Sequence, residues 1–102
     1  MPTEGNGQPL FCKISIDGAL AKELKLLRVR AKEAGVGGAY LDALQVAIFR
    51  MQNNPWGFGE LVRRLKKSPW SIHVRCIRPL IIEFAISEEH PVVYIRRVQL
   101  LI

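Results

Sequence analysis

The sequence predicts one α+β domain, in which an N-terminal strand and an antiparallel helical hairpin precede a three-stranded antiparallel meander. The chain has 102 residues, enough for one hydrophobic core but not for two. Apolar residues recur at helical spacing between residues 17 and 54 and alternate with polar ones from residue 70 onward. The helices are therefore expected to bury their apolar stripes against one face of the sheet.

The first expected strand is Leu10–Ile16, because apolar and polar side chains alternate along it. Residues 1–9 are polar and are expected to form a flexible N-terminal tail, leaving 10–102 as the domain. The tail lacks the apolar core of a signal peptide, and no run of about 18 apolar residues follows it. The sequence therefore predicts a cytoplasmic protein without a membrane segment.

Two helices are expected next. Asp17 can cap the first, whose apolar stripe ends at Gly35. After a Gly37-Gly38 link, the second helix continues until Asn53-Asn54-Pro55 breaks it. A link this short forces the two helices to run antiparallel.

Three strands complete the prediction, at residues 70–76, 80–86 and 92 to about 101. Pro79 marks the first connection and the polar segment Ser87–Pro91 the second, so the strands form an antiparallel meander. The last strand is apolar on both faces apart from Arg96, Arg97 and Gln99, which predicts a central place in the sheet.

Positive charge gathers in the C-terminal part of the chain. Residues 1–60 carry seven Lys or Arg against six Asp or Glu, whereas residues 61–102 carry eight against three. The net charge of +6 indicates a polyanion or an acidic protein as partner.

The order of elements, together with three short stretches, resembles the RelE/ParE superfamily of toxins from bacterial type II toxin–antitoxin systems. The stretches are Ala43-Leu44 in the second helix, the segment Asn54–Glu60 with its Pro and Phe-Gly, and the meander Arg75–Phe84. Their order and spacing carry the resemblance more than any one of them. It implies a RelE/ParE-like fold and a growth-inhibiting toxin that a cognate acidic antitoxin neutralises.

Members of this family that cut messenger RNA do so on the ribosome, and the resemblance implies the same activity here. The reaction is a metal-independent attack of the 2′-OH on the adjacent phosphate, and neither a cofactor nor a metal is expected because His73 and His90 have no further ligand in register. The candidate catalytic residues are His73, Arg75, Arg78, Glu83 and Tyr94. The candidate RNA-binding residues are Arg63, Arg64, Lys66, Lys67, Arg96 and Arg97.

Each candidate suits one step of that reaction. His73 and Glu83 can move protons, because histidine titrates near neutrality and burial can tune a carboxylate. Arg75 and Arg78 can hold the phosphate and the charge that develops on it. Tyr94 can donate a proton or stack on a base.

Other interpretations of the same residues stay open. His73 can be an exposed sheet histidine without a chemical role, and Glu83 can pair with Arg75 or Arg78 across the meander. The charged run 63–67 can be a solvated helical turn. No polar side chain follows Gln99, where nuclease members usually keep one. The alternatives are therefore a non-nuclease, ParE-type inhibitor of DNA gyrase and a degenerate member that only binds a protein partner.

Overall fold

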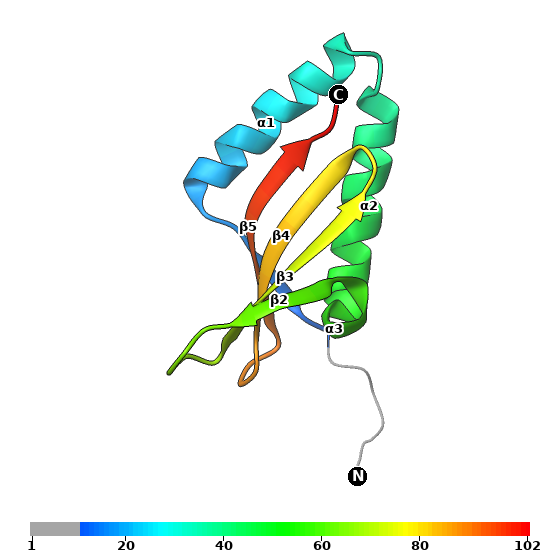
Figure 1. Ribbon diagram of the computed structural model, residues 1–102. Helices are drawn as coiled ribbons and strands as arrows, with labels where there is room; N and C mark the ends of the chain where they lie inside the picture. The colour runs from blue at the N-terminus through cyan, green and yellow to red at the C-terminus, as the bar shows by residue number, and fades with distance from the viewer. Residues whose placement is uncertain (1–10) are drawn as a thin grey trace.

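The computed structural model describes residues 11–102 and shows an α+β arrangement of three helices and five strands (Figure 1). In chain order the elements are β1 Lys13–Ser15, α1 Gly18–Glu33, α2 Gly37–Asn53, α3 Pro55–Phe58, β2 Glu60–Arg64, β3 Trp70–Ile77, β4 Leu80–Ser87 and β5 Val92–Leu100. The tail expected at residues 1–9, and Leu10 of the expected first strand, lie outside the described residues.

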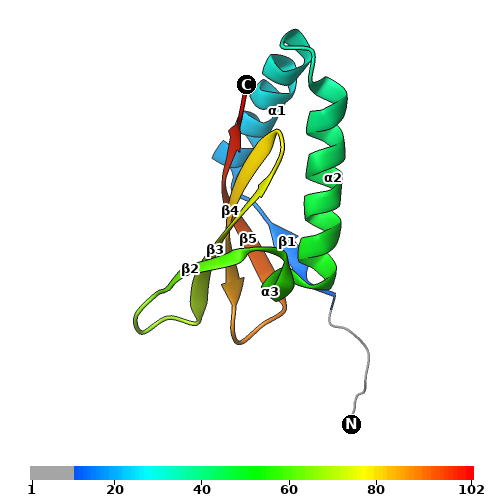
Figure 2. The ribbon, with the colours of Figure 1, turned by 45° about the vertical axis from the view of Figure 1, so that its right-hand side comes forward.

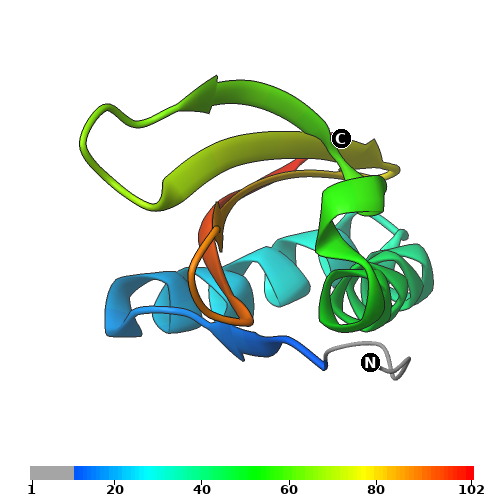
Figure 3. The same cartoon turned by 90° about the horizontal axis from the view of Figure 1, so that it is seen from below.

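The strands form one sheet in the order β1-β5-β4-β3-β2. β1 runs parallel to β5, and every other pair is antiparallel. The predicted meander of the last three strands is confirmed, and so is the central place of β5, which lies between β1 and β4. Helices α1 and α2 lie on one side of the twisted sheet, and no helix of the described chain covers the other side (Figures 2 and 3).

Two elements were not expected from the sequence. Residues 60–64, which fall in the expected loop before the second strand, form β2 at the edge of the sheet. A register shift between Leu61 and Arg63 shows a bulge, which breaks the two-residue period and conceals the strand. The single turn α3 is too short to show helical periodicity. Gly37 and Gly38 are not a link but the first residues of α2.

The ends of the helices are fixed by local hydrogen bonds. The Asp17 carboxylate accepts a hydrogen bond of 2.7 Å from the Leu20 N–H at the start of α1, as predicted. Gly35 follows this helix with a φ of +78°, a conformation that favours glycine. At α3, the Asn54 side chain accepts a hydrogen bond of 3.2 Å from the Gly57 N–H.

The core lies between the helices and the sheet. Tyr40 and Met51 of α2 are fully buried, as are Phe58 of α3 and Phe84 of β4. The Tyr40 hydroxyl donates a 3.0 Å hydrogen bond to the Leu24 carbonyl, which ties the two long helices together. Burial raises the pKa of this hydroxyl. The core thus leaves the outer sheet face free to carry polar groups.

Candidate functional site

The register between β3 and β4 decides which candidate residues share a face of the sheet. His73 lies opposite Phe84, and Val74 lies opposite Glu83. Because successive side chains of a strand point to opposite faces, His73 and Glu83 lie on different sides of the sheet. His73 faces the helices, while Glu83 faces the open side. The two proton-transfer candidates cannot act on one phosphate.

His73 is buried, with only 2% of its surface exposed. Its Nε2 lies 3.0 Å from the Ser71 hydroxyl, and its ring stacks on Phe84 and meets Trp56 edge-on, with centroids 5.5 and 5.3 Å apart. Nδ1 has no hydrogen-bond partner. Burial, and then the charge of Arg64, lower the pKa of the imidazole, so the ring is neutral near pH 7. The expectation of an exposed histidine is wrong, because α3 covers it.

The proposed phosphate clamp is not assembled around Glu83. The Arg75 guanidinium lies over the Phe58 ring, 5.6 Å from its centroid, on the helix side of the sheet. Arg78 is exposed in the turn between β3 and β4. Neither arginine pairs with Glu83, so that expectation is wrong. The carboxylate instead lies 3.3 Å from the guanidinium of Arg96.

The open face brings four of the predicted residues together. Glu83 lies opposite Arg97, and a register shift places Arg96 beside this pair. Glu83 and Arg96 each keep about a third of the side chain exposed, 35% and 37%. Tyr94 lies opposite Ala85, two residues further along β4, and is therefore a diagonal neighbour of Glu83.

Tyr94 is held in place by the start of α1. Its hydroxyl donates a 3.0 Å hydrogen bond to the Asp17 carboxylate. This bond raises the pKa of Tyr94. The Leu20 N–H and then the Tyr94 hydroxyl lower the pKa of Asp17. Tyr94 therefore keeps its proton at neutral pH, and its ring has a fixed orientation on the open face.

Beside Tyr94 the open face is hollowed into a cavity of about 290 Å³. Ile72 and Ala85, both buried, form its floor, and the rings of Trp70 and Tyr94 line it. Leu65 and Arg96 complete the lining. An apolar hollow with aromatic walls and a guanidinium at its edge is suited to an unstacked nucleobase next to a phosphate.

The basic run is exposed but is not the helical turn considered above. Arg63 and Arg64 belong to β2, and Lys66 and Lys67 form the turn that leads to β3. Arg63 lies opposite Ile72 and so borders the hollowed face. Arg64 is instead paired with Glu88 across 2.7 Å. The run therefore extends the positive charge of the open face along the sheet edge.

Sequence reasoning did not include Trp70 among the candidate residues and gave Asp17 only its capping role. The alternation of Trp70 with Ile72 is the signal that places both on one face.

Comparisons with family models, with curated proteins and with solved structures found no match to this chain. Within residues 11–102, no helix is long and apolar enough to cross a membrane, and no three His, Cys, Asp or Glu residues gather as a metal ion would need.

Proposed function

We propose that the protein is a growth-inhibiting toxin of the RelE/ParE type whose open sheet face binds messenger RNA on the ribosome. The observation that carries this proposal is the hollow between Trp70 and Tyr94 with Arg96 at its edge. The exposed run around Arg63 and Lys66 adds positive charge along the adjoining edge. An acidic antitoxin is the expected partner, since it would be attracted to the same charge.

Stacking and charge supply the affinity together. A base stacked on an aromatic ring contributes about 1–3 kcal/mol and does so for any sequence. Each phosphate neutralised by a Lys or Arg side chain releases counterions, so binding weakens as salt rises. Trp70 and Tyr94 provide the first contribution and Arg63, Arg96 and Arg97 the second. This combination is typical of proteins that bind single-stranded nucleic acid.

Cleavage on this face would rely on Glu83 rather than His73. The Glu83 carboxylate takes the proton of the 2′-OH as that oxygen attacks the adjacent phosphorus. Arg96 and Arg97 stabilise the charge that develops on the phosphate oxygens. The Tyr94 hydroxyl, released from its hydrogen bond to Asp17, donates its proton to the 5′ oxygen that leaves. The products are a 2′,3′-cyclic phosphate and a 5′-hydroxyl.

A non-nuclease inhibitor of DNA gyrase, of the ParE type, is the second candidate. The burial of His73 favours it, because this imidazole is kept away from a substrate on the open face. In this case the open face would bind a protein instead of RNA. A member that only binds a protein partner would use the same face without arresting growth.

Induced expression in a bacterial host separates these candidates. Growth would be followed while the 5′ ends of cellular RNA are mapped, for the natural chain and for Glu83→Gln and Arg96→Ala. The matched control is Arg28→Ala, an exposed arginine on α1. We expect growth arrest with new ends inside translated messages, a fall in cleavage of about 10²–10⁴-fold for Glu83→Gln, and no change for Arg28→Ala.

Other outcomes count against the proposal. Arrest without new RNA ends would favour the gyrase inhibitor. No arrest in any host would leave only the partner-binding member. Equal cleavage by Glu83→Gln and the natural chain would remove Glu83 from the reaction.

A further inference from the structure

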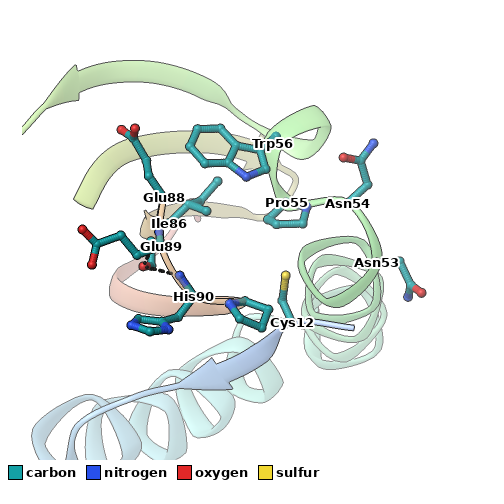
Figure 4. Close-up of a pocket in the computed structure, with 11 residues that line it drawn as sticks. Cys12, Asn53, Asn54, Pro55, Trp56, Ile86, Glu88, Glu89 and His90 are labelled. Atoms are coloured by element: carbon teal, nitrogen blue, oxygen red, sulfur yellow. Dashed lines mark hydrogen bonds between the residues drawn. The ribbon is translucent and has the colours of Figure 1, made fainter. Parts of the chain in front are cut away.

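We propose that the cavity between α3 and the β4–β5 loop binds an organic cation, an ammonium or guanidinium group carried on an apolar chain. The cavity measures about 540 Å³ and lies on the helix side of the sheet, away from the hollow beside Tyr94 (Figure 4). Its size is that of typical small-ligand sites. The proposal does not depend on the function proposed above.

Three segments that are distant in sequence build the cavity. Cys12 comes from the residue before β1, Pro55 and Trp56 from α3, and Ile86 from the end of β4. Cys12, Pro55 and Ile86 are buried and give an apolar floor. Burial raises the pKa of the Cys12 thiol, so this group is neutral and adds no anion. The floor suits the apolar part of a ligand.

Hydrogen bonds hold the walls of this cavity in place. The Cys12 N–H donates to the Gln52 carbonyl and the Lys13 N–H to the Pro91 carbonyl, each at 2.8 Å. The Ser87 hydroxyl accepts from the N–H groups of Glu89 and His90 at 3.2 and 3.0 Å. The cavity is therefore formed before a ligand arrives, which lowers the entropic cost of binding.

Trp56 keeps 46% of its surface exposed although it lines a concave site. Its position is set by the capped turn of α3 and by the edge-on contact with His73. In Figure 4 the ring lies over the cavity, with Glu88 beside it. Indole is the aromatic group that attracts a cation most strongly.

The charge around the cavity is opposite to that of the whole protein. Glu88 and Glu89 line it together with the His90 imidazole and the neutral amides of Asn53 and Asn54, and no Lys or Arg does. The three other described cavities each include a Lys or Arg side chain, in a chain with a net charge of +6. Arg64 does not line the cavity, but its guanidinium lies 2.7 Å from the Glu88 carboxylate and forms an ion pair with it. This pair offsets the charge of Glu88 and leaves the Glu89 carboxylate to attract a cation to the site.

This chemistry can come from a free small cation or from an arginine or lysine side chain of another protein. Calorimetric titration of the full chain would use agmatine as the small cation and the blocked tripeptide Gly-Arg-Gly as the peptide source. The uncharged 1,4-butanediol controls for the apolar chain, and matched NaCl controls for ionic strength. Tighter binding of agmatine assigns a small ligand, and tighter binding of the tripeptide assigns a protein side chain.

The variants are Trp56→Leu and the pair Glu88→Gln/Glu89→Gln, with Glu33→Gln at the exposed end of α1 as the matched control. We expect saturable binding of a cationic probe that weakens about tenfold or more in both cavity variants and is unchanged in the control. Circular dichroism checks folding, and the glutamine pair decides the result if Trp56→Leu unfolds. Three results would overturn the proposal. They are no saturable binding of either cation, binding of butanediol as tight as that of the cations, and an affinity of the Glu88→Gln/Glu89→Gln variant equal to that of the natural chain.

Discussion

Replacing His73 by leucine should remove most of the dependence of stability on pH between about pH 5 and pH 7.5. The buried imidazole has a pKa below its ordinary value of 6.5, whereas the unfolded chain has the ordinary one. As pH falls through 6.5, the unfolded state therefore binds more protons than the folded state, and the natural chain loses stability. One group exchanges at most one proton, which limits the slope to about 1.36 kcal/mol per pH unit.

At neutral pH the same substitution should change stability little. It removes Nδ1, a buried atom without a partner whose desolvation costs about 1–3 kcal/mol. It also removes the contact with Ser71, a hydrogen bond worth about 0.5–1.5 kcal/mol. These effects oppose each other, so the slope with pH, rather than the value at pH 7, tests the reasoning.

The assay is urea unfolding at a series of pH values for the natural chain, His73→Leu and His90→Leu. His90 is the other histidine of the chain and is exposed, which makes it the matched control. We expect the control to keep the slope of the natural chain and His73→Leu to lose most of it. An unchanged slope in His73→Leu, or a natural chain that gains stability as pH falls, would refute the account of a buried neutral imidazole.

Two further predictions concern packing and the tyrosine contact. A Cβ at Gly59 would lie 2.8 Å from the Phe84 ring, so Gly59→Ala should lower the free energy of unfolding in urea by about 1–3 kcal/mol. Gly38 has open space around it, so Gly38→Ala should instead stabilise α2 by about 0.5–1 kcal/mol. Equal effects of the two substitutions would contradict the close packing of Gly59 against Phe84. Asp17→Asn should lower the pKa of Tyr94 in an ultraviolet titration, because the carboxylate raises it; an unchanged titration would mean that the contact does not form in solution.

The sequence predicted the long periodic elements well, for physical reasons. α1, α2 and the last three strands each repeat their pattern over eight or more residues, so local irregularities do not hide the period. β2 was missed because its register shifts between Leu61 and Arg63, and the consecutive apolar residues Leu61 and Val62 are both exposed, so no alternation marks the strand. The one-turn α3 was missed because a single turn has no period to detect.

The candidate site was predicted in part, because residue types are visible in the sequence but sheet faces are not. Ile82 and Phe84 alternate with Ile81 and Ala85, so both faces of β4 look apolar. The turn at Arg78-Pro79 sets the register that separates His73 from Glu83. Alternation within one strand does not show how that strand is aligned with its neighbour. The pairing of Glu83 with Arg96 also depends on a bulge that the sequence pattern does not reveal.

We propose that RNA binds to the open sheet face and not to the helix side. An amide NMR titration of the labelled chain with a short single-stranded RNA tests it most directly. We expect the largest shifts at Trp70, Tyr94 and Arg96, weaker binding at higher salt, and loss of the shifts in Trp70→Leu. Shifts concentrated on α1 and α2, or no saturable shifts at low salt, would contradict it.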